Sequence, residues 1–272
     1  MGSELSARGV SYRNTSEVNL SQPDALIGIY RDYQAAGAQV FQTCTFAANL
    51  LMLERAGLAE QAAAIQTASV RIVREAVGPE PLLALDLGPT GRMLEPYGDL
   101  TREQAVACFR QQLEVMLPLP VDFVLLETFE ILEEVEAALE AIRDAGCPLP
   151  VAVTMSFSGP QGATMMGVTG DRAARALTDL GVDVLGANCG DVQGLREALR
   201  QMAEATDRPL MAQPNAGQPE LIGGQTVYAQ SPQDFGRYAQ ELLELGVRII
   251  GGCCGTRPAH IEQLAKLARA GV

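Results

Sequence analysis

Residues 246–256 read G-V-R-I-I-G-G-C-C-G-T. A glycine that can end a helix comes first, an apolar β-branched run follows it, and then come glycines around two adjacent cysteines, Cys253 and Cys254. Three other runs begin in a similar way, namely G-A-Q-V-F at 37–41, P-V-D-F-V at 120–124 and G-V-D-V-L at 181–185. This repetition indicates helices followed at once by strands, as in a parallel sheet covered by helices.

The same pattern along the chain predicts strands at about 38–43, 82–87, 121–127, 150–156, 182–188, 209–213 and 247–252. An open doubly wound sheet competes with a barrel, because an eight-stranded barrel needs one strand more. However, the polar, Gly-rich and Cys-rich segments all follow strand ends, as the active-site loops of barrels do. We therefore predict one α/β domain over residues 1–272, a TIM-type (β/α)8 barrel whose first strand is missing or lies upstream of Met1.

Helix starts can also be located in the sequence. S-Q-P-D at 21–24 and S-P-Q-D at 231–234 offer a capping hydroxyl, from Ser21 and Ser231, with proline in the first turn. Thr101 and Gln104 have the spacing of a capping box. We expect helices to begin at these three points.

Composition excludes several classes of protein. The net charge of −13 argues against nucleic acid or an acidic membrane surface as a partner, since both require basic patches. The sequence contains no signal peptide pattern and no apolar run near the roughly 20 residues that span a bilayer. The six cysteines lack the dense spacing of a secreted disulfide scaffold. We expect a reduced, soluble, cytoplasmic protein without membrane contact.

Cysteines end two of the expected strands, Cys189 in G-A-N-C-G and the pair Cys253 and Cys254. Parallel strands of a barrel end at one mouth, so these thiols can converge there. Three thiolates suit Zn²⁺ and leave a fourth position open, whereas ordinary core packing or a disulfide between the adjacent pair is the alternative. Cys108 and Cys147 lie in or beside helical stretches, and we expect them to be packed residues.

These motifs resemble those of the homocysteine S-methyltransferase family, zinc-dependent barrels that include the homocysteine module of cobalamin-dependent methionine synthase and the betaine- and S-methylmethionine-dependent enzymes. The resemblance covers essentially the whole chain. It is carried by G-A-N-C-G (186–190) and G-G-C-C-G-T-R-P-A-H-I (251–261), and by M-G-S-E-L (1–5), N-L-S-Q-P-D (19–24), T-C-T-F-A-A-N (43–49), G-P-T-G (88–91), L-E-P-Y-G-D (94–99) and P-N-A-G (214–217). The loop motifs at 88–91 and 94–99 resemble the methionine synthase branch most.

The resemblance implies that Cys189, Cys253 and Cys254 bind zinc, and that the open position takes the sulfur of homocysteine. A free thiol with a pKa near ~8.5 is mostly protonated at neutral pH, whereas a zinc-bound thiol is held as a thiolate that can attack a methyl group. By the same resemblance Glu127 binds the substrate ammonium, with Gln42, Thr43 and Asn188 as further substrate contacts. We interpret the single histidine, His260, as a capping or packing residue.

This chain departs from the family in three respects. Met1 occupies the methionine of the family's D-G-A-M-G, so that strand and its aspartate are absent, either from a late start or truncation or as a natural variant. The family's E-T-N-T-F is here Q-T-C-T-F, with Gln42 and Cys44 in place of glutamate and asparagine. Cys44 could approach the metal. Folate and cobalamin modules do not follow, so we expect a small sulfonium or ammonium methyl donor, or a methyl-corrinoid on a separate protein.

The leading hypothesis is a zinc-dependent methyltransferase that makes methionine from homocysteine. Gln42, Cys44 and the absent aspartate motivate a rival in which the acceptor is a different thiol. A non-catalytic zinc-binding barrel subunit is the alternative of another class. Barrels with exposed helices often dimerise, so an oligomer is compatible with the sequence.

Overall fold

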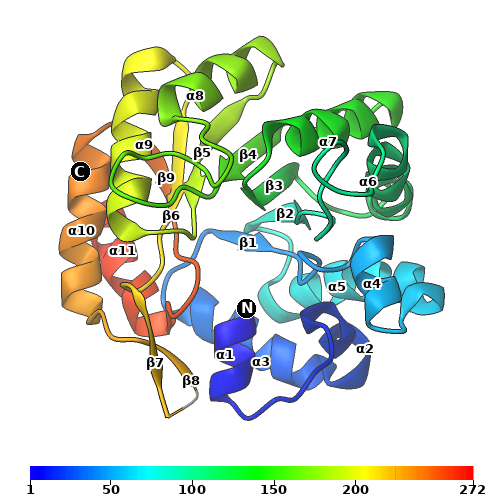
Figure 1. Cartoon of the computed structure of the whole chain (residues 1–272). Coiled ribbons are helices and arrows are strands. Elements are labelled where there is room, and N and C mark those ends of the chain that lie inside the picture. Colours follow the sequence, from blue (N-terminus) through cyan, green and yellow to red (C-terminus); the bar gives the residue numbers. More distant parts are fainter. Residues whose placement is uncertain (224, 272) are drawn as a thin grey trace. The chain divides into compact units, whose positions relative to one another are not determined.

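The computed structural model describes residues 1–223 and 225–271 (Figure 1). The described residues contain a sheet of seven strands in the order β1-β2-β3-β4-β5-β6-β9 and a separate hairpin of β7 and β8. All seven predicted strands are present with bounds close to those expected: β1 Val40–Gln42, β2 Leu82–Leu87, β3 Phe123–Phe129, β4 Val151–Met155, β5 Val184–Asn188, β6 Leu210–Gln213 and β9 Val247–Ile250. The register is parallel from β1 to β2 to β3, and from β5 to β6 to β9.

Residue contacts divide the chain into two compact units. The thiol unit comprises Met1–Ala7, Asp32–Ala38 and Val153–Val272, and the carboxylate unit comprises Arg8–Arg31 and Gln39–Ala152. Strand β4 and helix α3 (Pro23–Ala35) each begin in the carboxylate unit and end in the thiol unit. That residues 1–272 act as one domain therefore stays a prediction.

Helices alternate with the strands in both units. The thiol unit contains α1 Gly2–Ala7, α8 Gly170–Asp179, α9 Val192–Ala205, α10 Pro232–Glu244 and α11 Pro258–Ala270. The carboxylate unit contains η1 Thr15–Glu17, α2 Val18–Ser21, α4 Leu50–Arg55, η2 Ala59–Gln61, α5 Ala62–Val77, α6 Arg102–Met116 and α7 Leu132–Asp144. Strand β2 shows why the sheet needs this cover, because Leu83, Ala84, Leu85 and Leu87 are all fully buried. No helix in the described part of the chain is long and apolar enough to cross a membrane.

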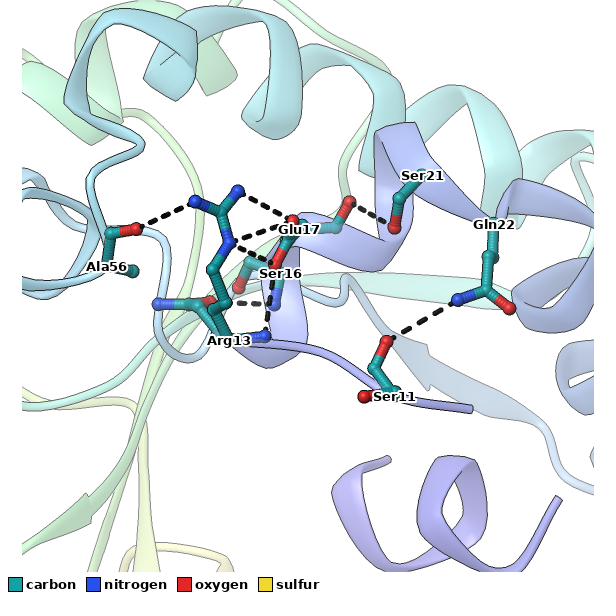
Figure 2. Close-up of polar contacts among 8 residues, drawn as sticks. Ser11, Arg13, Ser16, Glu17, Ser21, Gln22 and Ala56 are labelled. Carbon is teal, nitrogen blue, oxygen red and sulfur yellow. Dashed lines mark hydrogen bonds and ion pairs between the residues drawn. The ribbon is translucent and has the colours of Figure 1, made fainter. Parts of the chain in front are cut away.

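The segment before the first strand is held by short helices and side-chain contacts (Figure 2). The Arg13 guanidinium pairs with Glu17 at 2.7 Å and donates to the Ala56 carbonyl oxygen at 3.3 Å. The Gln22 amide donates to the Ser11 carbonyl oxygen at 3.5 Å. Residues 1–37 contain no strand, as the sequence indicated.

Two of the three expected helix caps are confirmed. Thr101 forms a capping box with Gln104 at the start of α6, and the Ser231 hydroxyl accepts the Asp234 N–H at the start of α10. A helix does begin at the third point, because α3 starts at Pro23, but the expectation that Ser21 caps it is wrong. Ser21 is the last residue of α2, and its hydroxyl donates backwards to the Glu17 carbonyl oxygen, as Figure 2 shows.

The hairpin of β7 (Pro219–Ile222) and β8 (Gln225–Tyr228) was not expected from the sequence. Its antiparallel strands have four residues each, and Leu221 is 78% exposed, so no long apolar run in the sequence marks them. Figure 1 shows it apart from the strands of the sheet.

Candidate functional site

Three cysteine thiols meet in the thiol unit. Cys189 directly follows β5, and Cys253 and Cys254 lie in the loop after β9. Their Sγ atoms all lie within 4.8 Å of one another, and those of Cys253 and Cys254 are 3.9 Å apart. All three residues are half-buried. The structure therefore brings together the thiols that the sequence placed at strand ends.

The backbone after β5 bends sharply at Cys189. Cys189 and Gly190 have φ of 56° and 60°, in the left-handed region that side chains other than glycine rarely adopt. A Cβ atom at Gly190 would lie 2.2 Å from the Phe157 carbonyl oxygen, so only glycine fits there. Positive φ at a cysteine carries strain, and such strain is common at functional sites. The Cys189 N–H is fixed by the Gln213 carbonyl oxygen at 3.0 Å.

The segment after β6 links the two cysteine loops. The Cys253 N–H donates to the Pro214 carbonyl oxygen at 2.8 Å, and the Cys254 N–H donates to Asn215 Oδ1 at 3.0 Å. The amide nitrogen of Asn215 donates to the Gly190 carbonyl oxygen at 3.0 Å. Asn215 thus holds both loops at a fixed spacing, and the two adjacent thiols reach one point because their backbone has left strand geometry.

Tyr228, at the end of β8, is a residue of this cluster that the sequence did not reveal. Its hydroxyl forms a hydrogen bond with the sulfur of Cys254. Its side chain packs on Gly255, where a Cβ atom would lie 2.3 Å from Tyr228 Cβ. Gly255 has a φ of 77°, so this position needs glycine for two reasons. No spacing signal in the sequence connects a tyrosine on an unpredicted hairpin with the thiols.

The thiol cluster concentrates negative charge on one sulfur. Hydrogen bonds from Cys189 and Cys253 lower the pKa of Cys254 to about 2, and the Tyr228 hydroxyl contributes in the same direction. The hydrogen bonds that Cys253 shares with Cys189 and Cys254 raise its pKa well above the usual range. The protons of these groups are therefore shared within the cluster. A thiolate at neutral pH is the form in which cysteine binds a metal.

The carboxylate unit holds two of the other predicted site residues in contact. Gln42 ends β1, and its amide nitrogen donates to Glu127 Oε2 at 2.7 Å. Glu127 is half-buried within β3, which continues two residues beyond the predicted end. The next residue, Thr128, has a φ of 64°, an outlier for a β-branched side chain. Thr128 thus interrupts the regular strand geometry of β3 directly after Glu127, whereas Cys189 lies just beyond the end of β5.

Thr43 and Asn188 are buried polar residues in different units. The Thr43 hydroxyl shares a hydrogen bond of 2.6 Å with Thr45 and accepts the Asp86 N–H at 3.0 Å. Asn188 is fully buried at the end of β5, directly before Cys189. Substrate contact by either residue stays a prediction.

The remaining cysteines and the histidine have local partners. The Cys44 thiol donates to the Thr15 carbonyl oxygen at 3.5 Å, and burial raises its pKa to about 12. The thiol of Cys108 in α6 lies 3.6 Å from Asn49 Oδ1, whereas Cys147 is half-buried after α7. His260 Nδ1 accepts the Arg257 N–H at 3.1 Å at the start of α11, which confirms its capping role.

Comparison with known proteins places these features in a family. Residues 1–268 match the sequence profile of the family described as homocysteine S-methyltransferase. The chain belongs to the homocysteine S-methyltransferase family. Among its relatives, betaine–homocysteine S-methyltransferase 1 of Mus musculus is 33% identical over 275 residues, covering 93% of this chain and 66% of the mouse protein. The chain therefore spans slightly less than two thirds of the length of the mouse protein.

Two further members of the homocysteine S-methyltransferase family support the assignment. S-methylmethionine–homocysteine S-methyltransferase BHMT2 of Rattus norvegicus is 34% identical over 272 residues, covering 93% of this chain and 71% of the rat protein. The crystal structure of the homocysteine methyltransferase MmuM from Escherichia coli, in its metallated form, has a TM-score of 0.82 at 25% identity and covers 98% of this chain and 93% of that one. This likeness confirms the predicted α/β class with a TIM-type barrel.

Proposed function

We propose that this chain transfers a methyl group to the thiol of homocysteine, giving methionine, with a zinc ion bound by Cys189, Cys253 and Cys254. The observation that carries the proposal is the convergence of these three Sγ atoms within 4.8 Å. An all-sulfur donor set suits zinc better than magnesium, calcium or manganese, which prefer oxygen ligands. Family membership and a structural relative solved in a metallated form support it.

The residues of the cluster would supply three of the four ligands of a tetrahedral site and leave the fourth for the substrate sulfur. Bound zinc would lower the pKa of the substrate thiol and so keep it as a thiolate at neutral pH. Asn215 holds the two cysteine loops in place through its hydrogen bonds to Cys254 and Gly190. We propose that Glu127, oriented by Gln42, binds the substrate ammonium group.

We propose a methyl donor that carries its methyl on a positively charged centre, as betaine and S-methylmethionine do. Both compounds appear in the names of the relatives. In the reaction the thiolate sulfur forms a bond to the methyl carbon, and the bond from that carbon to nitrogen or sulfonium sulfur breaks with its electron pair. The donor leaves as a neutral amine or thioether centre. A methyl-corrinoid on a separate protein is the alternative donor.

Two features bear on the acceptor and on the cellular location. Gln42, a neutral amide, contacts Glu127 where the family has a second carboxylate, which favours a different thiol as the alternative acceptor. If the protein binds zinc but transfers no methyl group, the alternative is a non-catalytic zinc-binding subunit.

We also propose a cytoplasmic location, because the clustered thiols must stay reduced to bind a metal.

X-ray absorption spectroscopy of the zinc-loaded, reduced protein tests the proposed function. We expect one zinc per chain with three sulfur neighbours, and a fourth sulfur when homocysteine is added. Zinc that does not respond to homocysteine would favour another thiol acceptor or the non-catalytic subunit. Absence of zinc from reduced protein prepared without chelators would overturn the proposal.

Replacing Tyr228 by phenylalanine should weaken zinc binding by about 10-fold, because partners that hydrogen-bond to metal ligands typically contribute 10- to 100-fold to affinity. Competition with a chromophoric chelator measures the change. Tyr238→Phe is the matched control, since Tyr238 also lies in the thiol unit but donates its hydroxyl to the Val192 carbonyl oxygen at 2.7 Å. Equal zinc affinity in the two variants would show that the hydroxyl of Tyr228 does not support the site.

A further inference from the structure

Asp86 is a buried carboxyl group that the proposed mechanism does not yet use. It lies near the end of β2 and is only 3% exposed. Its backbone is fully engaged, because its N–H donates to Thr43 Oγ1 and its carbonyl oxygen accepts from Thr45 Oγ1 at 2.7 Å. Its Oδ1 atom has no hydrogen-bond partner in the described structure. A buried carboxyl oxygen without a partner is costly, so its retention needs a reason.

The strand register places Asp86 on the same face of the sheet as Glu127 and Gln42. Asp86 pairs with Leu125 across β2 and β3, and Glu127 lies two residues beyond Leu125. Gln42 pairs with Ala84, two residues before Asp86. Side chains two residues apart in a strand point to the same face. The carboxyl groups of Asp86 and Glu127 are accordingly hydrogen-bonded to each other.

The charge state of the two carboxyl groups favours a cation as their ligand. Burial, and next the negative charge of Glu127, raise the pKa of Asp86 well above its usual range. Each of these two carboxyl groups disfavours the negative charge of the other, so the pair favours holding a proton or a cation. A cation that binds between the two carboxyl groups can replace this proton and pair with Asp86 Oδ1, the oxygen that has no hydrogen-bond partner.

An ammonium group suits these residues better than a divalent metal ion. Calcium takes six to eight oxygen ligands and magnesium six, whereas this face offers two carboxyl groups. Gln42 directs its NH₂ group, a donor, at Glu127, and a donor does not coordinate a metal ion. An ammonium group has three N–H donors and matches carboxyl acceptors directly.

We propose that Asp86 is a second carboxylate that, with Glu127, binds the ammonium group of the amino-acid substrate. This inference rests on the proposed function, because it names the residue that selects homocysteine over thiols without an amino group. Asp86 is a binding residue in this assignment and takes no part in methyl transfer.

The test compares the binding of homocysteine with that of 4-mercaptobutanoate, which lacks only the amino group. Isothermal titration calorimetry of zinc-loaded protein gives both dissociation constants. We expect D86N to weaken the binding of homocysteine by about 10- to 100-fold, which is the usual contribution of a hydrogen bond to a charged group. The binding of 4-mercaptobutanoate should weaken by less than about 3-fold. Asparagine is neutral and close in shape to protonated aspartate, so the variant should fold. If D86N does not fold, the same test is made with D86S, which has a smaller side chain.

Glu134→Gln is the matched control. Glu134 is likewise 3% exposed in the carboxylate unit, and burial raises its pKa, but it accepts from the N–H and hydroxyl of Thr90. We expect the Glu134→Gln variant to have the wild-type ratio of the two dissociation constants. If D86N leaves the ratio of the two dissociation constants unchanged, because both thiols lose the same affinity or neither loses any, the assignment of Asp86 alone is overturned. Wild-type protein that binds neither thiol would overturn the proposed function, and this inference with it.

Discussion

Replacing Cys254 by serine is expected to abolish stoichiometric zinc binding and to lower methyl transfer to homocysteine by at least about 1,000-fold. Loss of a group that only supports a ligand already costs 10- to 100-fold in affinity, so loss of a ligand itself should cost more. Cys254 is also the thiol whose pKa is lowered by its neighbours Cys189 and Cys253, which favours the thiolate form that binds a metal. Zinc content by mass spectrometry, together with the rate of methionine formation, measures both effects.

Cys147→Ser is the control for this variant. Cys147 is a half-buried free cysteine that follows α7 in the carboxylate unit, outside the thiol cluster. The control should keep its zinc and its activity. A Cys254→Ser variant with one zinc per chain and more than about a tenth of the wild-type rate would contradict the assignment of Cys254 as a ligand.

The fold could be predicted from the sequence wherever apolar runs are long and bounded by glycine or proline. Strand β2 has the predicted ends of Leu82 and Leu87, and every leucine in it after Leu82 is fully buried. The hairpin of β7 and β8 could not be predicted, because its strands are short and its exposed Leu221 breaks the expected burial pattern. Ser21 was misassigned because a serine before proline looks the same whether it ends one helix or caps the next.

The candidate site could be predicted where the chemistry of a residue is unusual for its position. Cysteines among glycines at strand ends and a glutamate after an apolar run both stand out. Asp86 lies alone within L-L-A-L-D-L and was missed, since only the strand register shows that it shares a face with Glu127. Tyr228 was missed because its contact with Cys254 depends on where the hairpin folds. The family resemblance predicts the three cysteines as ligands but does not point to Asp86 or Tyr228.

Gly186→Ala is expected to destabilise the protein by about 3 kcal/mol, a large part of the roughly 5–15 kcal/mol that stabilises a typical domain. A Cβ atom at Gly186 would lie 1.8 Å from the Met211 carbonyl oxygen. Gly186 and Met211 are register partners in β5 and β6, so the backbone atom that must move is held by the ladder of strand hydrogen bonds. The strain would reach Cys189, three residues further along. We therefore expect weaker zinc binding as well as a lower urea midpoint.

Gly28→Ala should change stability in the opposite direction. Gly28 lies inside α3, and a Cβ atom there would meet only the end of Arg8, at 3.6 Å, an ordinary contact. Alanine in a helix interior is favoured over glycine by about 0.5–1 kcal/mol, because glycine loses more conformational freedom on folding. Urea unfolding of both variants beside the wild type gives the comparison. A Gly186→Ala protein that unfolds at the wild-type midpoint would show that β5 and β6 can separate at this point, and the close approach of the strands would not be what positions Cys189.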